Sequence, residues 1–381
     1  MIATWRIYCK ELGHEKIIHC SELLARAGGG VKTYVDALYG VMGTSFAPEF
    51  LASLGAVDPA VTALLHVHEE RLLSQYQGQV PIVFTAHNHD AYCPSGTRYF
   101  STSQTPCDRT LSVVGCTWGH YAGGCGSRRP QKVWEGLRRA QEACGALQRH
   151  RIPVIANSDF VRTQFLRHGV PPEQVVTLRY GIREPEVFCP PLTEAVHRAQ
   201  RILFLGRIVP DKGLDWLLET LKLLPAPIHL DIAGDGWYRE QVQGHCESLG
   251  LGDRVTWHGW CNGVQLDALF AQCFAVVFPS LWHEPAGIVT LEAYARHRPI
   301  IASAVGGIPE HVRAGETGLL VPVNDRAGLA AAIAHLVADR QQAIALGLAG
   351  RRWYEEAFTI AHHARLLQSI YDRTISQWVP A

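Results

Sequence analysis

The sequence of 381 residues has no long apolar run and no excess charge of either sign. Because a helical membrane span needs roughly 20 consecutive apolar residues, we expect none here. Lysine plus arginine and aspartate plus glutamate number 35 each, so the net charge is zero with histidine neutral. This balance argues against a protein that works mainly by coating nucleic acid, and we expect no nucleic-acid partner.

The marks of a secreted protein are also missing. The first fifteen residues mix charged and apolar side chains and lack the continuous apolar stretch of a signal peptide. The eleven cysteines are odd in number and scattered along the chain, unlike the framework of a small disulfide-rich domain. We therefore expect a cytoplasmic protein in which most cysteines are buried thiols.

Short apolar runs do alternate with longer segments of helical period, which is typical of a parallel sheet covered by helices. The pattern pauses at 184–200, where Pro185, Pro190 and Pro191 disfavour helix and strand. The sequence therefore predicts two α/β domains joined by this linker. Strands are expected at 16–21, 64–68, 81–87, 153–158, 201–208, 228–235, 254–259, 274–280, 299–307 and 317–323, and helices at 214–224 and 264–273.

Residues 88–130 interrupt the first half with a segment rich in glycine, serine, threonine, cysteine and proline. A loop of this length inside a compact domain is usually functional or mobile. None of its cysteines shows the Cys-x2-Cys spacing of structural zinc, so we expect no metal. Unpaired thiols and thiols that steady the loop both remain open for Cys93, Cys107, Cys116 and Cys125.

A basic segment follows at 128–167, with nine lysines and arginines against three acidic residues. An apolar stripe at helical spacing runs through it, so a peripheral contact with anionic lipid is one interpretation. The alternative is a helix packed on the core with a solvated basic face. The stripe consists of Val133, Leu137, Ala140, Cys144 and Leu147.

The strongest functional pattern is EPAGIVTLE at 284–292, directly after the expected strand 274–280. Pro285 suits the first turn of a helix, and the free N–H groups of such a turn can hold a phosphate. Glu284 and Glu292 are too far apart to share a proton, so they should serve opposite ends of an elongated ligand. A carboxylate that binds ribose hydroxyls is familiar in α/β folds, and Glu292 fits that role.

A second pattern, GRIVPDKG at 206–213, places Arg207 and Lys212 after the first strand of the second domain. Ligands of open α/β sheets bind at the carboxyl ends of the strands, and two cations there suit a diphosphate. Glycine-rich turns at 233–236 and 306–307 end later strands and leave space for a ligand.

These motifs resemble the donor domain of the retaining glycosyltransferases of family 4, whose GT-B fold has two Rossmann-like domains facing a deep interdomain cleft. The resemblance covers nearly the whole chain and is most specific at 201–320. It implies that Arg207 and Lys212 bind the donor diphosphate, that Glu284 contacts the sugar, and that Glu292 holds the ribose. Ala286 departs from it, since an aromatic residue is frequent there. The implied donor-binding set is Gly30, Gly206, Gly234, Asp235, Gly236, Ala286, Gly287, Ile288, Val289 and Glu292.

The first half resembles the same family more diffusely. Gly30 closes a glycine-rich turn that resembles the family's cleft-facing loop, with an ordinary strand–helix turn as the alternative. His87 matches the family's histidine after the third expected strand, and a histidine there could bond a sugar hydroxyl or steady the reacting centre. His89 competes for that role. Tyr180 stands where asparagine is more usual.

The resemblance implies the following organisation. Residues 1–183 form an acceptor-binding Rossmann-like domain, 184–200 a linker, 201–357 the donor-binding domain, and 358–381 a helix that crosses back to the first domain. The implied activity is transfer from a UDP- or GDP-sugar to a glycan or lipid-linked acceptor in bacterial polysaccharide or glycoconjugate synthesis, with Arg207, Lys212, Glu284 and His87 as catalytic candidates and no cofactor or metal. The alternatives are a nucleotide-sugar epimerase or hydrolase of the same fold and an inactive nucleotide-sugar-binding homologue.

Overall fold

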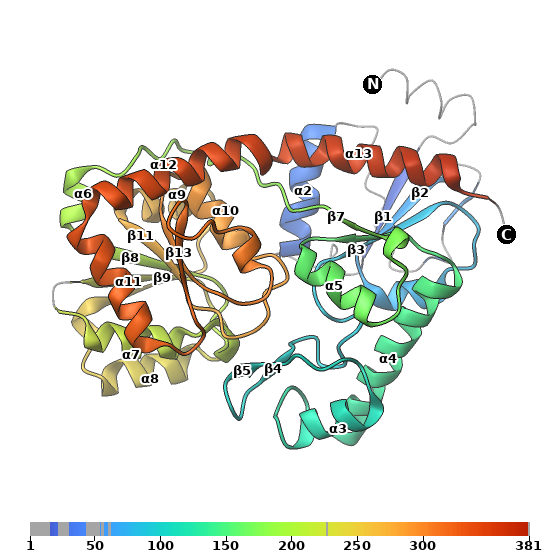
Figure 1. Ribbon diagram of the computed structural model, residues 1–381, viewed down its shortest axis with the longest axis horizontal. Helices are drawn as coiled ribbons and strands as arrows, with labels where there is room; N and C mark the ends of the chain where they lie inside the picture. Colours follow the sequence, from blue (N-terminus) through green and yellow to red (C-terminus); the bar gives the residue numbers. More distant parts are fainter. Residues whose placement is uncertain are drawn as a thin grey trace. The chain divides into compact units, whose positions relative to one another are not determined.

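The computed structural model describes residues 16–21, 30–42, 54, 57–59, 62–225 and 228–379. The chain divides into two compact units, which Figure 1 shows. Unit 1 comprises residues 1–98, 108–182 and 360–381, and unit 2 comprises residues 99–107 and 183–359. Among the described helices, none combines the length and the apolar character needed to cross a bilayer.

Unit 1 is built on a parallel sheet with the strand order β1-β2-β3-β6-β7. Parallel strands require crossover connections, and helices form most of these here. The strands are β1 (Lys16–Cys20), β2 (Thr62–Val67), β3 (Ile82–Ala86), β6 (Val154–Ala156) and β7 (Val175–Thr177), and the helices are α2 (Gly30–Met42), α3 (Val113–Tyr121), α4 (Pro130–Arg149), α5 (Asp159–Arg167), α13 (Ile360–Gln377) and the 3₁₀ turns η4 (Glu70–Gln75) and η5 (Pro172–Gln174).

Unit 2 is a second parallel sheet, with the order β10-β9-β8-β11-β12-β13. Its strands are β8 (Arg201–Leu205), β9 (His229–Ala233), β10 (Val255–Gly259), β11 (Ala275–Phe278), β12 (Ile300–Ser303) and β13 (Gly318–Val321). Its helices are α6 (Glu194–Arg198), α7 (Leu214–Leu223), α8 (Arg239–Ser248), α9 (Gly263–Gln272), α10 (Ile288–Ala295), α11 (Arg326–Ala338) and α12 (Arg340–Ala357), with the 3₁₀ turns η6 (Pro210–Lys212), η7 (Gly252–Arg254) and η8 (Ile308–Glu310).

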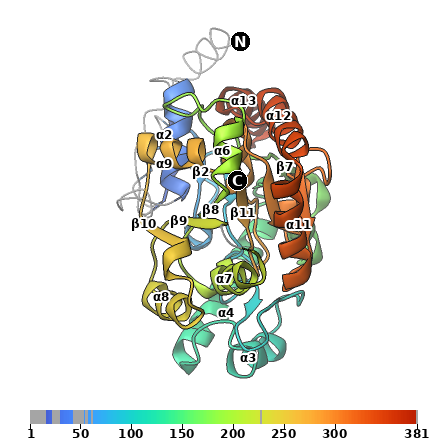
Figure 2. The ribbon, with the colours of Figure 1, turned by 90° about the vertical axis from the view of Figure 1, so that its left-hand side faces the viewer.

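Helices cover both faces of the sheet in unit 2. Helices α7, α8 and α11 lie on one face and α9, α10 and α12 on the other (Figures 1 and 2). Double coverage explains why β8, β11 and β12 read as nearly continuous apolar runs. Their central residues Ile202, Val276 and Ile301 are fully buried, and each such side chain contributes roughly 1.5–3 kcal/mol by its removal from water.

The expected linker and long loop contain more regular structure than their composition indicates. Helix α6 lies near the carboxyl end of the 184–200 linker. The prediction that this linker contains no helix was therefore wrong for its last residues. The helix starts after the last proline because the Thr193 side chain accepts a hydrogen bond from the Val196 N–H at 3.3 Å and caps it. Within 88–130, α3 is helical, and residues 99–107 form the β4–β5 hairpin, which groups with unit 2 rather than with unit 1.

The basic segment 128–167 packs on the core of unit 1. Its apolar stripe lies on α4, which contacts η4 and joins the same apolar cluster as the strands. The five stripe residues are at most 8% exposed, so they are not available to lipid in this structure. The structure therefore favours the second interpretation, in which the apolar side supports the fold and the basic side faces solvent.

Histidines line the opposite face of the sheet in unit 1. Side chains alternate along a strand, so Ile18, Leu65 and Phe84 join the apolar cluster while His19, His66 and Thr85 point to the other face. Helices α2 and α13 pack over this second face, with α13 in contact with α2, β2 and β3. Their tyrosines supply hydrogen-bond partners for buried imidazoles. Tyr371 bonds His66 Nδ1 at 2.6 Å, and Tyr34 bonds His363 Nε2 at 2.8 Å.

We predict that Tyr371→Phe lowers the free energy of unfolding of unit 1 by about 1–3 kcal/mol, because it removes the hydroxyl bonded to the buried His66 Nδ1. Urea unfolding followed by fluorescence measures the change. The matched control is Tyr121→Phe, at a side chain that is 43% exposed, where a change within about 0.5 kcal/mol is expected. Equal effects of the two substitutions would contradict the importance of the Tyr371–His66 bond.

Candidate donor site

The predicted donor residues of unit 2 follow the carboxyl ends of its strands. Because all six strands are parallel, these ends meet at one edge of the sheet. The strand order reverses direction between β8 and β11, and such a switch point opens a crevice in which open α/β sheets bind ligands. Gly206 and Arg207 follow β8 directly, and Ser280 and Glu284 follow β11. The two strongest sequence motifs therefore converge at the switch point.

The loops at this edge approach one another closely. Gly234 has φ +149°, and a Cβ atom there would lie 1.8 Å from the carbonyl oxygen of Gly206. Gly306 has φ +60°, and a Cβ atom there would lie 2.4 Å from the carbonyl oxygen of Glu284. A side chain at either position would force two backbones apart. The N–H of Gly307 also donates to the Glu284 carbonyl at 2.8 Å, which fixes the loop that carries Glu284.

The half-buried Lys212 and the buried Glu284 form an ion pair. Lys212 Nζ lies 2.5 Å from Glu284 Oε1, and Ser280 Oγ donates to the same oxygen at 2.6 Å. Glu284 Oε2 has no bonding partner within the described part of the chain, so this oxygen is left to accept a hydrogen bond from a ligand. The Lys212 ammonium also lies 5.0 Å from the centre of the Trp282 ring, close enough for a cation–π contact.

Arg207 completes the charge at this edge. Its side chain is exposed and makes no ion pair with any residue in the described ranges. The pKa of the Asp211 carboxyl is shifted by the charges around it. Burial and the Glu284 charge raise its pKa, while Lys212 and Arg207 lower it. Lys212, Arg207 and Glu284 therefore all lie within electrostatic reach of Asp211, with an exposed arginine and a half-buried lysine among them.

Glu292 lies on α10, which begins at Ile288 rather than at Pro285. The expectation that Pro285 occupies the first helical turn was wrong, because Gly287 in the left-handed conformation (φ +71°) precedes the helix. Ala286 is buried, and Ile288 and Val289 form the first turn, whose N–H groups have no carbonyl partner within the helix. Burial raises the pKa of the Glu292 carboxyl, and the nearby Arg296 charge acts against this rise.

Three further predicted donor residues take other positions. Gly236 closes the turn after β9, where Asp235 Oδ1 accepts its N–H at 2.7 Å. Asp235 is exposed and also pairs with Arg239 at 3.3 Å, so its side chain supports its own loop. Gly30 is the first residue of α2 in unit 1, and the two glycines before it lie outside the described residues.

His87 belongs to a chain of buried hydrogen bonds in unit 1. His19 Nδ1 lies 2.8 Å from His68 Nε2, and His68 Nδ1 lies 2.7 Å from His87 Nε2. His87 Nδ1 bonds the Tyr180 hydroxyl, which also accepts from Asn157 Nδ2 at 3.3 Å. With Asn157 as donor, the tyrosine proton faces His87 Nδ1, so each imidazole donates from Nε2 to the next.

This chain changes the interpretation of His87. Both of its ring nitrogens are bonded within unit 1, so bonding a sugar hydroxyl would require breaking one of these bonds. Tyr180, which departs from the family pattern, supplies the partner on one side. His89 is bonded to Tyr92 at 2.6 Å and is fully buried. His87 therefore has no available nitrogen in this structure, and His89 is closed off from solvent.

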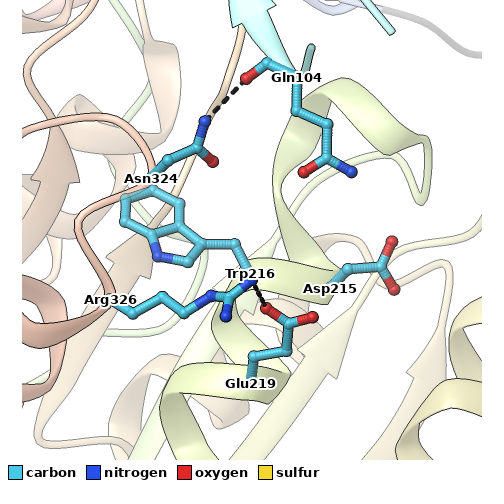
Figure 3. Close-up of a pocket in the computed structure, with 6 residues that line it drawn as sticks. All are labelled: Gln104, Asp215, Trp216, Glu219, Asn324 and Arg326. Atoms are coloured by element: carbon cyan, nitrogen blue, oxygen red, sulfur yellow. Dashed lines mark hydrogen bonds and ion pairs between the residues drawn. The ribbon is translucent and has the colours of Figure 1, made fainter. Parts of the chain in front are cut away.

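A separate hollow of about 280 Å³ lies in unit 2 beside the β4–β5 hairpin (Figure 3). Asn324 Nδ2 donates to the Gln104 carbonyl at 2.8 Å across it, and Arg326 pairs with Glu219. None of the predicted donor residues lines it. Its lining residues are Gln104, Asp215, Trp216, Glu219, Asn324 and Arg326.

The sequence is similar to those of known glycosyltransferases. Residues 193–353 match the family model described as glycosyl transferases group 1. A GDP-mannose-dependent α-(1-6)-phosphatidylinositol monomannoside mannosyltransferase of Mycolicibacterium smegmatis is 29% identical over 258 residues, which are 63% of this chain and 65% of that protein. An alpha-maltose-1-phosphate synthase of the same organism is 33% identical over 243 residues, 58% of this chain and 62% of that protein. The matched segments thus span less than two thirds of either relative.

The structure of Anabaena HepE in complex with UDP-glucose aligns with a TM-score of 0.71 at 18% identity, over 94% of this chain and all of that chain. The fold is thus GT-B, with two Rossmann-like α/β domains. The family match lies wholly within unit 2 and includes Arg207, Lys212, Glu284 and Glu292. Residues 193–353 of unit 2 are therefore similar to the glycosyl transferases group 1 family, the family that the sequence motifs resemble.

Sequence reasoning missed several residues that shape these sites. Ser280 was noted only as part of a motif, yet it bonds the catalytic candidate Glu284. His66 and His68 are two residues apart in an apolar run, and this spacing could have predicted that both side chains lie on the same face of the sheet. Arg296 gave no sign in the sequence, because its role depends on a partner from another helix.

We predict that acid destabilises unit 1 through its buried histidines. Burial lowers the pKa of His19 and His87 to about 3 and that of His363 to about 4, and it also lowers those of His66 and His68. The unfolded chain binds protons near pH 6.5 and the folded chain does not, so stability is present above pH 6.5 and is lost as pH falls below it.

The expected slope is about 1.4 kcal/mol per pH unit for each titrating histidine, measured by urea unfolding at pH 7.5, 6.5 and 5.5. His68→Gln should reduce the slope, whereas His150→Gln, at an exposed position of the same unit, should leave it unchanged. Equal unfolding free energies at pH 7.5 and 5.5 would refute the neutral state of these histidines.

Proposed function

We propose that the chain is a retaining glycosyltransferase that moves a sugar from a nucleotide-diphosphate sugar to a hydroxyl of a glycan or lipid-linked acceptor, in bacterial glycoconjugate synthesis. The observation that carries the proposal is the Lys212–Glu284 pair at the switch point, 2.5 Å between charged atoms, with the exposed Arg207 beside it. In a sugar donor the sugar and the diphosphate meet at one bond. A carboxylate for the sugar and cations for the diphosphate must therefore be neighbours, as they are here.

The proposed step breaks the bond between the sugar anomeric carbon and the diphosphate oxygen and forms a bond to the acceptor oxygen on the same face. The bonding electrons leave with the diphosphate, which takes up the acceptor proton. Arg207 and Lys212 stabilise the charge that grows on the diphosphate. Glu284 Oε2 accepts from a sugar hydroxyl, and Glu292 binds the ribose.

The donor is a UDP- or GDP-sugar in this proposal. One relative is named for GDP-mannose and one structural neighbour holds UDP-glucose, so both bases are supported. The phosphatidylinositol monomannoside in the name of the first relative supports a lipid-linked acceptor. The reaction needs no metal in our proposal, since two cationic side chains already face the diphosphate. We place it in the cytoplasm, as expected from the sequence.

The rivals are an epimerase or hydrolase of nucleotide sugars and an inactive binding protein. An epimerase or hydrolase would act on the donor without an acceptor, and an inactive homologue would bind the donor without turnover. The presence of all four charged residues of the donor motif argues against the inactive homologue.

Transfer by the intact chain tests the function directly. We expect incubation with UDP- and GDP-sugars and a panel of glycan and lipid-linked acceptors to give a product that keeps the anomeric configuration of the donor, read by NMR, with the rate unchanged by EDTA. Donor consumed equally without any acceptor would favour the rivals. An inverted product would overturn the retaining mechanism.

Substitutions should separate the roles of the donor residues. Lys212→Ala should lower kcat by roughly 10²–10³-fold with a smaller effect on donor affinity, because its charge matters most as the diphosphate leaves. Glu292→Ala should chiefly weaken binding of donor and free nucleotide. Glu284→Ala should spare binding of the bare nucleotide diphosphate but harm use of the sugar donor.

Lys222→Ala, at an exposed lysine of the same unit, is the matched control and should change neither parameter. Arg207→Ala should resemble Lys212→Ala, and the two losses should not add, since both residues act on one leaving group. Full activity of Lys212→Ala would show that the assignment is wrong.

A further inference from the structure

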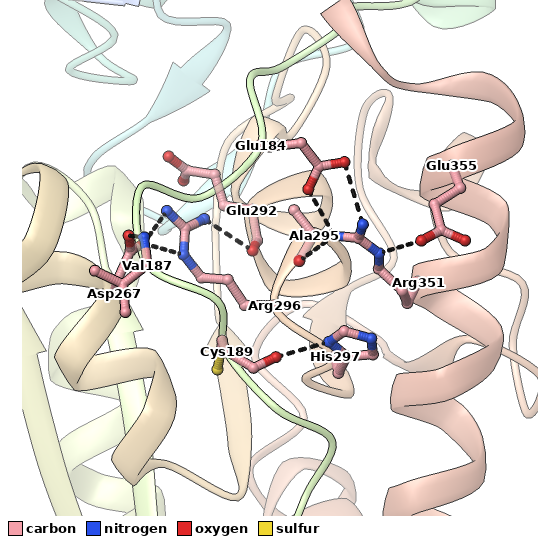
Figure 4. Close-up of polar contacts among 10 residues, drawn as sticks. All are labelled: Glu184, Val187, Cys189, Asp267, Glu292, Ala295, Arg296, His297, Arg351 and Glu355. Carbon is pink, nitrogen blue, oxygen red and sulfur yellow. Dashed lines mark hydrogen bonds and ion pairs between the residues drawn. The ribbon is translucent and has the colours of Figure 1, made fainter.

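Three consecutive residues directly after α10, Arg296, His297 and Arg298, all bond neighbouring segments with their side chains. Figure 4 shows the first two of them. His297 Nδ1 donates to the Cys189 carbonyl at 2.9 Å, and Arg298 donates to the Pro190 carbonyl at 2.8 Å. These bonds attach the extended segment 184–190 to the helix that carries Glu292. His297 has φ +55°, a conformation that costs a non-glycine residue about 1 kcal/mol or more. His297 adopts this backbone conformation despite the cost.

Arg296 makes the most specific contacts of the three. Its Nε and Nη2 lie 2.7 and 2.6 Å from Asp267 Oδ1, and its guanidinium carbon lies 4.5 Å from the centre of the Phe270 ring. Its Nη1 donates to the backbone carbonyl of Glu292, four residues earlier, at 3.1 Å. A planar, forked cation satisfies all of these contacts together, whereas a lysine ammonium would satisfy only part of them.

Asp267 links this arginine to the extended segment. Its second oxygen, Oδ2, accepts the Val187 N–H at 2.8 Å, and the side chain is almost completely buried. A buried arginine and a buried aspartate each need the other, because an unpaired charge in this place would be costly. Segment 184–190, α9 and α10 are therefore joined through one ion pair, one turn from the Glu292 carboxylate.

Glu292 itself lacks such support. Its carboxylate makes no hydrogen bond or ion pair to any residue in the described part of the chain, as Figure 4 illustrates. Helix α10 packs against α12, β11 and β12. Among the described residues on these elements and on α10 itself, Arg296 is the charged group that acts on the Glu292 carboxyl.

We propose that Arg296 is a positioning residue of the nucleotide site, which holds Glu292 in place and keeps its carboxylate charged for the ribose hydroxyls while it ties α10 to segment 184–190 through Asp267. This inference rests on the proposed role of Glu292 in ribose binding. A charged carboxylate accepts roughly twice as strong a hydrogen bond as a neutral group, so its ionisation matters for affinity. Burial alone favours the protonated form, and the Arg296 charge opposes it.

The test is the pH dependence of UDP and GDP binding to the intact chain, measured by calorimetry between pH 5 and 8. Protonation of Glu292 should weaken binding as the pH falls, and this fall in affinity is the acid limb of the pH profile. In Arg296→Gln the Glu292 carboxyl loses its cation, so its pKa rises and the acid limb moves to higher pH. A move of about one pH unit corresponds to about tenfold weaker binding below the midpoint. The ionisation of the diphosphate itself is the same for every variant and cancels in the comparison.

Two further variants separate charge from structure. Arg296→Lys keeps a positive charge but loses the fork, so affinity should fall at all pH values with the acid limb unmoved. Arg351→Gln is the matched control. Arg351 donates to Ala295 O at 2.7 Å and pairs with Glu184 at 2.8 Å, so it attaches the same segment to the same helix without acting on Glu292. The Arg351→Gln substitution should leave the acid limb of the affinity profile at the same pH as in the wild type.

A 2′,3′-dideoxynucleotide provides the matched ligand. Without ribose hydroxyls, wild type and Arg296→Gln should bind it alike at every pH. An unmoved acid limb in Arg296→Gln, with wild type binding normally, overturns the inference and leaves the proposed function intact. If the wild type binds neither UDP nor GDP at any pH, the proposed function fails, and the role given to Arg296 fails with it.

Discussion

The candidate donor site depends on how closely the loops at one edge of a parallel sheet approach each other. At Gly234 and Gly306 the backbone of one loop touches that of another so closely that no side chain fits between them. The contact at Gly234 joins the loops after β8 and β9, and the contact at Gly306 joins the loops after β11 and β12. A third glycine joins these two pairs, because a Cβ atom at Gly213 would lie 1.9 Å from the carbonyl oxygen of Pro279. Only then can residues 72 positions apart in sequence, such as Lys212 and Glu284, form a pair. The charges define the chemistry, but the glycines make their meeting possible.

The two units use buried polar groups in opposite ways. Unit 2 concentrates full charges at a sheet edge, where cations suit an anionic ligand. Unit 1 buries histidines in a neutral state and joins them by hydrogen bonds from strand to strand and to α13. Neutral imidazoles tolerate burial because each can both donate and accept. The hydrogen-bonded histidines stabilise the fold of unit 1, whereas the charges at the sheet edge of unit 2 suit the binding of an anionic ligand.

Much of unit 2 was predictable from sequence. Apolar runs ending in glycine-rich turns predicted its strands. The motifs after β8 and β11 predicted a candidate site, and they do converge, because parallel strands bring these ends together. The start of α10 was misplaced because Gly287, not Pro285, sets the boundary. Strand β7 was missed because three residues form too short a run to show a pattern.

The role of His87 shows why the rest could not be read from the sequence. Its position at a strand end suggested a group open to a sugar, and this much depends only on the order of residues. Whether its nitrogens are available depends on His68 and Tyr180, one 19 and the other 93 residues away. Likewise, the hairpin at 99–107 groups with the distant half of the chain. Such partnerships come from packing, which composition and spacing do not encode.

The two carboxylates of the donor motif illustrate one solution to a shared conflict. Glu284 is buried and Glu292 is half-buried, and removal of a carboxylate from water favours the uncharged acid. Glu284 has Lys212 on the same oxygen that Ser280 bonds, so its cation contacts the carboxylate directly. The cation near Glu292 is Arg296, which is already held by Asp267 and is therefore not available to a phosphate. Lys212 bonds a carboxylate oxygen of Glu284 directly, whereas Arg296 bonds the Glu292 backbone carbonyl and is fixed by Asp267. The same electrostatic conflict is thus met in two ways, by a cation on the carboxylate itself and by a cation held beside the backbone of the glutamate.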